Sequence, residues 1–446
     1  MQGLSLLMAW PRPRSGPASQ PAPPLPIIMR IPTALLALAP FAAFAADKSH
    51  QDFRADATAA YQRKDYAAAK AAITSALQLR PDSPHYLHTL AALSALTDEP
   101  KAALESLHRL AALGVVTNIQ RDPDLASLQG TPEFARILND FAANRAPQGE
   151  TDVVAELPGL TGIIEGIAFR ARTGDLFLGD VHHRCIWRRD RTGQIARFTA
   201  EDEELLGIFG IAIDETRNAL WAAMTALPEM SGFTAELKGT AALAEFNLAT
   251  SELRRVVPVP GDGREHGLGD LLIAPDGTVY ATDSIAPVIW KLAPDAEELQ
   301  KVVDSPVFGS LQGLVLEQRT LLVADYVNGL FTVDLGTGNI NALAPPKNTT
   351  LLGIDGVVAI PGGIVAVQNG VEPQRVIRLT LSPGLDVISG FAVLASALPN
   401  VRDLCLVTLV NDRPTFVAGS GWDGFDPAKA KQPPAHTVRI FQAALR

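Results

Sequence analysis

The feature that most constrains this chain is a sixfold internal repeat in about its last two thirds. Each unit begins with a short inner run that usually holds a glycine, and two more β-prone runs follow it. The units begin at Glu165, Phe209, Gly269, Gln312, Asp355 and Arg402, so their spacings are 44, 60, 43, 43 and 47 residues. A period of 40–50 residues with about four strands per unit is typical of a β-propeller. The sequence therefore predicts a six-bladed β-propeller over residues 146–446, whereas an open sandwich would leave the repetition unexplained.

The two ends of this region predict how the ring closes. The run from Asp152 to Leu157 precedes the first unit and has no partner there, while no residues remain after Leu445 for an outer strand in the last unit. We expect the early strand to complete the last blade, because such closure removes exposed strand edges.

Residues 46–145 differ from the propeller region in the spacing of their apolar residues. They are rich in Ala and Leu at helical intervals, and the run from Ala60 to Tyr66 is followed by Ala69, Ile73, Ala76 and Pro81. This pattern resembles a tetratricopeptide repeat and covers about two repeats. We expect a small all-α, tetratricopeptide-like domain that docks a protein partner and performs no chemistry.

Residues 1–45 form a leader that is typical of export. Met29-Arg30 is followed by an apolar run from Ile31 to Phe44 and by the small-residue pattern Ala43-Phe44-Ala45. We expect translation to start at Met29 and a signal peptide to be cleaved before Ala46, which gives a periplasmic or secreted protein. A membrane anchor is the alternative, but the run holds two prolines and falls short of the roughly 20 residues of a spanning helix. No membrane span is expected in the mature protein.

Composition excludes several classes of function. The formal net charge is −10 and no Lys/Arg stripe exists, which excludes a nucleic-acid partner. Cys185 and Cys405 form no disulfide framework and no CxxC zinc spacing, so both are expected to be ordinary buried apolar residues. The chain has no GxSxG, HExxH or P-loop motif.

Polar residues recur where the inner strands begin. Within a blade, the start of the first strand and the loop between the second and third strands lie at the same end. Glu165, Gln312 and Asp355 should therefore ring one mouth of the channel, together with Asp270, Arg402 and Asp403. Like charges on one axis are costly unless a cation lies between them, which favours a divalent metal. The alternative is that these groups only face channel water.

Three of these runs support a family resemblance. Glu165-Gly-Ile-Ala-Phe, Gly269-Asp-Leu-Leu-Ile-Ala-Pro-Asp-Gly277 and Asp355-Gly-Val-Val resemble the regucalcin/gluconolactonase propellers of the senescence-marker-protein type. The resemblance implies one divalent cation held by Glu165, Gln312 and Asp355, with Asp355 also the catalytic base for water. Gln312 and Gly269 stand where the family usually has Asn. Oxygen ligands favour calcium, with magnesium, manganese or zinc as alternatives.

The resemblance also implies a substrate side of the site. Asp270 is expected to line it, and Arg402, Asp403 and His183 are further candidates for substrate binding. The His182-His183 pair is either a proton shuttle or part of the loop packing. The longer second unit provides either a substrate lid or a contact surface. Asp180, Asp283 and Asp325, at the ends of second strands, are expected to cap turns.

Two functions follow from these expectations. The first is an exported, metal-dependent hydrolase of a sugar lactone or related ester. The alternative is a non-catalytic propeller that scaffolds a complex of the cell envelope with its helical region.

Overall fold

The computed structural model describes residues 48–445, which form a helical segment followed by a six-bladed β-propeller. The predicted fold class is therefore confirmed. The leader and its predicted cleavage site lie outside the described residues. Within the described residues, no helix is both long and apolar enough to cross a membrane.

The helical segment begins with a well-defined cap. The side chain of Ser49 accepts a hydrogen bond from the backbone N–H of Asp52, and the carboxylate of Asp52 accepts one from the backbone N–H of Ser49, so both ends of this capping box are satisfied. The helices are α2 (His50–Gln62), α3 (Tyr66–Leu79), α4 (Pro84–Leu96), α5 (Pro100–Ala112) and α6 (Pro132–Asn144), with the short 3-10 helices η1 (Ile119–Arg121) and η2 (Pro123–Leu128).

The described chain divides into two compact units. The first comprises the chain up to Pro81 with His85–Ser106 and Asn118–Thr131, and the second comprises Asp82–Pro84, Leu107–Thr117 and Pro132–Arg446. In the first unit, the buried His88 lies 2.8 Å from Asp122, and the Tyr61 hydroxyl donates to Asp124. The second unit contains the entire propeller.

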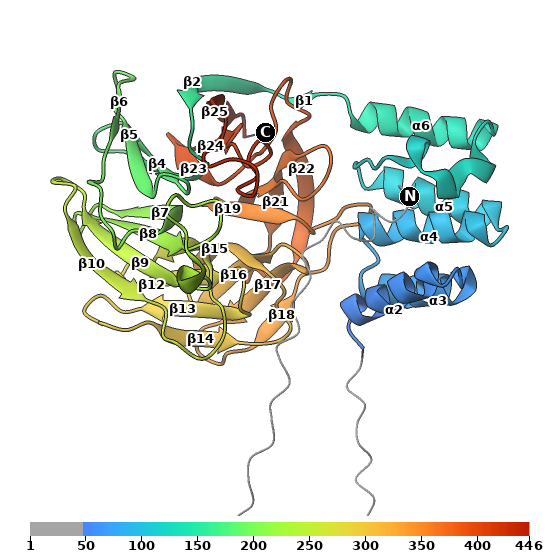
Figure 1. Ribbon diagram of the computed structural model, residues 1–446, viewed down its shortest axis with the longest axis horizontal. Coiled ribbons are helices and arrows are strands. Elements are labelled where there is room, and N and C mark those ends of the chain that lie inside the picture. Colours follow the sequence, from blue (N-terminus) through green and yellow to red (C-terminus); the bar gives the residue numbers. More distant parts are fainter. Residues whose placement is uncertain (1–47, 446) are drawn as a thin grey trace, which may run out of the picture. The chain divides into compact units, whose positions relative to one another are not determined.

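Each blade is an antiparallel sheet whose strands, apart from the early strands β1 and β2, follow chain order from the axis outward, and the sheets succeed one another in the colour order of Figure 1. The first three blades are β3 (Ile164–Arg170), β4 (Asp175–Asp180), β5 (Cys185–Arg189) and β6 (Ile195–Arg197); β7 (Gly207–Asp214), β8 (Ala219–Thr225), β9 (Ala241–Asn247) and β10 (Leu253–Pro258); and β11 (Leu268–Ile273), β12 (Val279–Asp283), β13 (Val288–Leu292) and β14 (Gln300–Asp304). The short 3-10 helix η3 (Ala235–Leu237) lies between β8 and β9.

The remaining blades show how the ring closes. They are β15 (Leu311–Glu317), β16 (Thr320–Asp325), β17 (Gly329–Asp334) and β18 (Ile340–Ala342); β19 (Ile354–Ile360), β20 (Gly363–Gln368), β21 (Arg375–Leu381) and β22 (Ile388–Ser396), with β1 (Gln148–Gly149) beside β22; and β23 (Val407–Val410), β24 (Arg413–Ala418), β25 (His436–Ala443) and β2 (Thr151–Leu160). The early strand β2 pairs with β25 from Thr151 opposite Ala443 to Leu160 opposite His436. The predicted closure of the last blade by this strand is confirmed.

Glycines in the inner strands explain why the repeat carries them. A Cβ at Gly166 would lie 2.1 Å from the carbonyl oxygen of Phe209, and one at Gly313 would lie 2.6 Å from the backbone nitrogen of Val357. Neighbouring inner strands therefore approach too closely for any side chain at these positions. This close approach brings the polar residue that precedes each glycine toward the axis.

Candidate active site at the propeller axis

Buried acids at the ends of second strands hold the loops around the mouth in place. Asp325 accepts hydrogen bonds from the backbone N–H groups of Gly309, Ser310, Val327 and Asn328. Asp180 and Asp283 make equivalent bonds to their own loops. The predicted capping role of these three acids is confirmed, and the loops that carry the site are consequently fixed.

Three carboxylates from different blades lie near one another at the axis. Burial, together with the neighbouring charges of Asp355 and Asp270, raises the pKa of Glu165 to about 8. Burial raises the pKa of Asp270 to about 7, again with a contribution from Asp355. Burial also raises the pKa of Asp355 to about 6, against a hydrogen bond that lowers it. Within residues 48–445, none of the three forms an ion pair with a Lys, Arg or His.

Glu165 is held by two groups from the sixth blade. The indole Nε1 of Trp422 donates to its Oε2, and the thiol of Cys405 lies 3.2 Å from the same oxygen. Burial raises the pKa of Cys405 well above that of an ordinary thiol, so the group is protonated and donates S–H. Cys405 is buried as predicted, but sequence reasoning missed its contact with the axial acid. The sequence feature that could have indicated this contact is the position of Cys405 in the inner run of the sixth repeat.

Asp355 is positioned by Asn369, which directly follows strand β20. Asn369 Nδ2 donates to Asp355 Oδ2 at 2.7 Å and to the carbonyl oxygen of Leu404 at 2.8 Å. Two acceptors on the amide nitrogen fix the orientation of the amide group. Its Oδ1 atom is buried and has no hydrogen-bond donor among the described residues. An unpaired buried acceptor beside two carboxylates is costly, and it suits a cation or a ligand hydroxyl.

Gln312 lies beside the position where the family resemblance expects a second asparagine. Its Nε2 donates to Ser310 Oγ at 3.1 Å, and a Cβ at Gly269 would lie 3.4 Å from its Oε1. The same Cβ would lie 2.4 Å from Ser284 Oγ, so a side chain at position 269 would require Ser284 to move. The two departures from the family pattern therefore occur side by side: the longer amide at 312 lies next to the position that has no side chain.

The other predicted substrate-binding residues make different contacts. Asp403 accepts from the backbone N–H of Asp423 at 2.8 Å, and burial raises its pKa to about 6. His183 Nδ1 lies 2.8 Å from Asp180 Oδ2, which raises the pKa of this imidazole and ties it to the first-blade turn. Arg402 lines a separate cavity of about 550 Å³ that Gln374 and Leu398 also line. Glu165, Asp270 and Asp355 are the predicted residues that the structure brings together.

The donor set at the axis fits a hard cation. Glu165 and Asp355 supply carboxylate oxygens, Asn369 contacts Asp355 and has an unpaired Oδ1, and Gln312 supplies an amide oxygen from the start of inner strand β15. Among residues 48–445, no three or more His, Cys, Asp and Glu side chains form a metal-binding group by themselves. A cation here would therefore need the two amide oxygens and water as well as the carboxylates, a mixture that calcium and magnesium accept.

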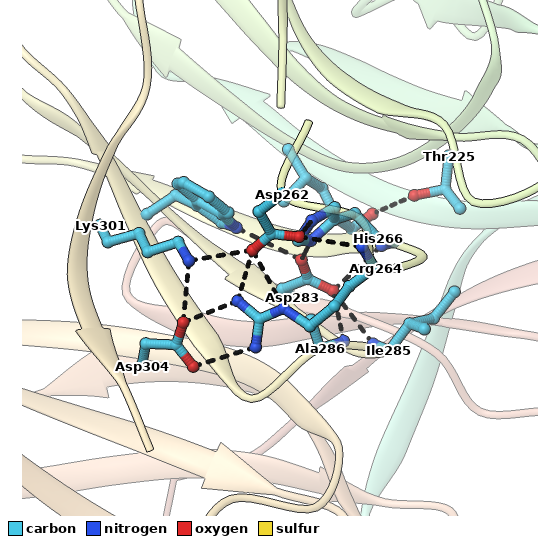
Figure 2. Close-up of polar contacts among 12 residues, drawn as sticks. Thr225, Asp262, Arg264, His266, Asp283, Ile285, Ala286, Lys301 and Asp304 are labelled. Atoms are coloured by element: carbon cyan, nitrogen blue, oxygen red, sulfur yellow. Dashed lines mark hydrogen bonds and ion pairs between the residues drawn. The ribbon is translucent and has the colours of Figure 1, made fainter. Parts of the chain in front are cut away.

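A second cluster of acids lies at the edge of the third blade and, unlike the axial acids, is paired with basic side chains (Figure 2). Arg264 reaches Asp304 with two nitrogens, at 3.1 and 2.6 Å, and also pairs with Asp262. Lys301 lies 2.9 Å from both acids, and His266 bridges Asp262 at 3.0 Å and the buried Asp283 at 2.6 Å. We call Asp262, Arg264, His266, Lys301 and Asp304 the rim network. Each of its acids has a basic partner.

Comparison with known proteins adds information on the fold. No family model and no curated protein matches the chain. Similar solved structures include a gluconolactonase from Xanthomonas campestris, with 15% identity over 68% of this chain and 93% of that one and a TM-score of 0.46. They also include the PQQ-bound aldose sugar dehydrogenase from Streptomyces coelicolor (16% identity, 67% and 100% of the chains, TM-score 0.45) and virginiamycin B lyase from Staphylococcus aureus (12%, 67% and 100%, 0.44). The activities in these names are those of the solved proteins.

Proposed function

We propose that this protein hydrolyses a lactone or a related carboxylic ester at the propeller axis, with the help of a divalent cation. The observation that carries the proposal is the group of Glu165, Asp270 and Asp355, three acids with raised pKa values, in which the charge of Asp355 raises the pKa of the other two. Proteins bury like charges together mainly where a cation or a proton is part of the chemistry.

Four side chains would hold the cation: Glu165, Asp355, Gln312 and Asn369. When bound, it would supply Lewis-acid polarisation of the substrate carbonyl. Asn369 supports this assignment because its buried Oδ1 has no donor among the described residues. Asp270 lies on inner strand β11, which contacts the strand β15 that carries Gln312. In this proposal Asp270 would face the substrate.

Asp355 is the base in this proposal. Its pKa of about 6 leaves it ionised at neutral pH yet basic enough to take a proton. Its carboxylate would accept one proton from water while the water oxygen bonds to the substrate carbonyl carbon. The ring or ester C–O bond then breaks, and the leaving oxygen takes up that proton. Asn369 holds Oδ2 of Asp355 throughout, so the base keeps one orientation.

A pH-stat assay on a panel of lactones and esters tests the proposal. The panel should contain an aldonolactone, an alkyl-substituted γ-lactone and an aryl acetate, each with and without calcium, magnesium or manganese. We expect cation-dependent hydrolysis that is lost in Asp355→Asn and retained in Asp304→Asn, which changes an acid of the rim network. If no compound is hydrolysed, or if Asp355→Asn hydrolyses as fast as the wild type, the proposal is wrong and the non-catalytic scaffold takes its place.

We also propose that the protein acts outside the cytoplasm. The support is the leader described above, with its apolar run before Ala43-Phe44-Ala45. Mass spectrometry of the protein from its native cells should find an N-terminus near Ala46. Retention of Met1 or Met29 on cytoplasmic protein would contradict export.

A further inference from the structure

A cavity of about 800 Å³ opens between two loops of the propeller mouth. One wall is the loop between β8 and β9, the insertion that makes the second repeat longer, and it contributes Met230 and Phe233. The other wall is part of the loop between β24 and β25, and it contributes Phe425, Lys429 and Lys431. The volume lies within the range of about 300–1,000 Å³ that is common for small-molecule sites.

The insertion wall is fixed to its neighbours. The backbone N–H of Ser231 donates to the carbonyl oxygen of His182 at 2.9 Å, and His182 Nδ1 donates to the carbonyl oxygen of Glu229 at 2.7 Å. Met230 is 3% exposed, and its sulfur accepts from the backbone N–H of Gly207 at 3.1 Å. This wall is therefore preformed, which lowers the entropic cost of binding a ligand against it.

His182 provides one polar group inside the cavity. A carbonyl oxygen only accepts hydrogen bonds, so Nδ1 of His182 carries the proton in the contact with Glu229. Nε2 takes no part in this contact, and His182 lines the cavity. The ring also meets Phe425 edge to face, with centroids 5.4 Å apart. The two walls consequently meet at an aromatic contact.

The second wall brings positive charge to an acidic protein. Lys429 pairs with Asp426 at 2.6 Å, and Lys431 has no ion-pair partner among residues 48–445. The segment 425–431 therefore carries a net charge of +1 in a chain of formal net charge −10. A lining that combines Met230, Phe233 and Phe425 with two lysines suits an organic anion with an apolar body.

One turn joins this cavity to the axial site. The backbone N–H of Phe425 donates to the carbonyl oxygen of Trp422 at 3.3 Å, so residues 422–425 form a β-turn. Trp422 donates to the axial Glu165 from one side of this turn, while Phe425 lines the cavity from the other. A molecule in the cavity therefore lies next to the loop that reaches the axial acids.

We propose that this cavity binds the non-reacting part of the substrate, and that this part is an alkyl or aryl chain that carries a carboxylate. The identity of the bound molecule as substrate rests on the proposed function. The apolar walls select against a simple sugar acid, which would leave its hydroxyls unpaired against Met230, Phe233 and Phe425. Lys429 and Lys431 attract the carboxylate.

Calorimetry with three probes tests the inference: 4-phenylbutyrate, its neutral amide 4-phenylbutanamide, and gluconate. We expect phenylbutyrate to bind at least tenfold more tightly than gluconate and about three- to tenfold more tightly than the amide. The double variant Lys429→Gln/Lys431→Gln should bind phenylbutyrate no better than the amide, with its affinity for the amide unchanged. The matched control Lys347→Gln removes an exposed lysine elsewhere and should change neither affinity.

The outcomes separate this inference from the proposed function. Gluconate binding as tightly as phenylbutyrate, or an unchanged preference in the double lysine variant, would overturn the inference. Asp355→Asn should retain phenylbutyrate binding while it loses hydrolysis. Hydrolysis without phenylbutyrate binding would contradict this inference but not the proposed function. Phenylbutyrate binding without hydrolysis of any lactone or ester would contradict the proposed function and leave the cavity as a binding site.

Discussion

The axial acids and the rim network place the same chemical group in opposite surroundings. In the rim network, hydrogen bonds from Arg264 and Lys301 lower the pKa of Asp304 to about 2 and hold that of Asp262 below its ordinary value. At the axis, burial raises the pKa of Glu165 to about 8, and no Lys, Arg or His is paired with it among the described residues. The rim acids are satisfied within the chain. The axial acids are satisfied by a proton or by something that the chain must bind.

This difference separates structural acids from candidate functional ones. Asp283 is as deeply buried as any axial acid, but its oxygens accept from three backbone N–H groups, from the indole of Trp290 and from His266. Glu165 and Asp355 have fewer donors and face each other's charge. Burial alone is therefore a poor guide to function, and the number of donors around a buried acid is a better one.

The largest expected effect is on catalysis. Asp355→Asn should lower kcat for the best lactone or ester by roughly 10²–10⁴-fold, because the variant removes the proton acceptor while it keeps the side-chain shape. The rim variant Asp304→Asn should leave kcat within about twofold. Steady-state kinetics on purified protein check both values, and equal losses in the two variants would erase the distinction between the clusters.

The next effect is on stability, and it differs between Asp283, the acid that contacts the rim network through His266, and the axial acid Asp270. Asp283→Ala should lower the free energy of unfolding by about 3 kcal/mol or more, because it leaves buried donors without an acceptor. Asp270→Asn should leave it unchanged or raise it by up to about 1 kcal/mol at pH 8 without added cation, because it removes a repelled charge. Urea unfolding measures both. A loss of more than about 2 kcal/mol in Asp270→Asn would show that this acid is structural.

The pH dependence of stability sharpens the comparison. Glu165, Asp270 and Asp355 have raised pKa values in the folded protein, so between about pH 4 and pH 8 the folded state binds more protons than the unfolded state. The free energy of unfolding of the cation-free protein should therefore fall as pH rises from 5 to 8, by at least about 2 kcal/mol. Asp304 has a lowered pKa, so its contribution is present above about pH 4 and is lost as pH falls toward 2.

A matched variant identifies the source of that slope. His266, whose pKa is raised by Asp283, also loses its contribution as pH rises, so the wild-type curve alone does not separate the two regions. Asp270→Asn should flatten the decline between pH 5 and pH 8, and saturating calcium should flatten it as well. Arg264→Met should leave the slope in this range unchanged. An unchanged slope in Asp270→Asn would place the titrating groups elsewhere.

The smallest effect concerns the residue that positions Asp355. Asn369→Leu should weaken calcium binding about tenfold, because it removes both the unpaired Oδ1 acceptor and the hydrogen bond to the base. Asn369→Asp should restore part of the affinity, since it returns an oxygen at the same place. A leucine variant that binds calcium as tightly as the wild type would limit Asn369 to a packing role.

The sequence predicted much of the fold and part of the site. The sixfold repeat and the unpaired run before it predicted the six blades and the closure of the last blade by β2, because a β-propeller repeats one unit and leaves few edges. The inner-strand positions of Glu165, Asp270 and Asp355 followed from the same repeat. The contacts of Cys405, Trp422 and Asn369 did not, because they depend on how the loops before β23, after β24 and after β20 fold at the mouth. Repeat spacing carries no information on those loops.

The most direct test of the central claim is the number of calcium ions bound per chain at pH 7.5. Isothermal titration, checked by elemental analysis of the dialysed complex, should give one ion for the wild type and for Asp304→Asn. Asp355→Asn and Glu165→Gln should bind at least tenfold more weakly, with their folds unchanged by circular dichroism. Manganese should replace calcium if the latter is not the preferred ion. The absence of any bound ion in the wild type, or an ion that both axial variants retain at full affinity, would contradict the account.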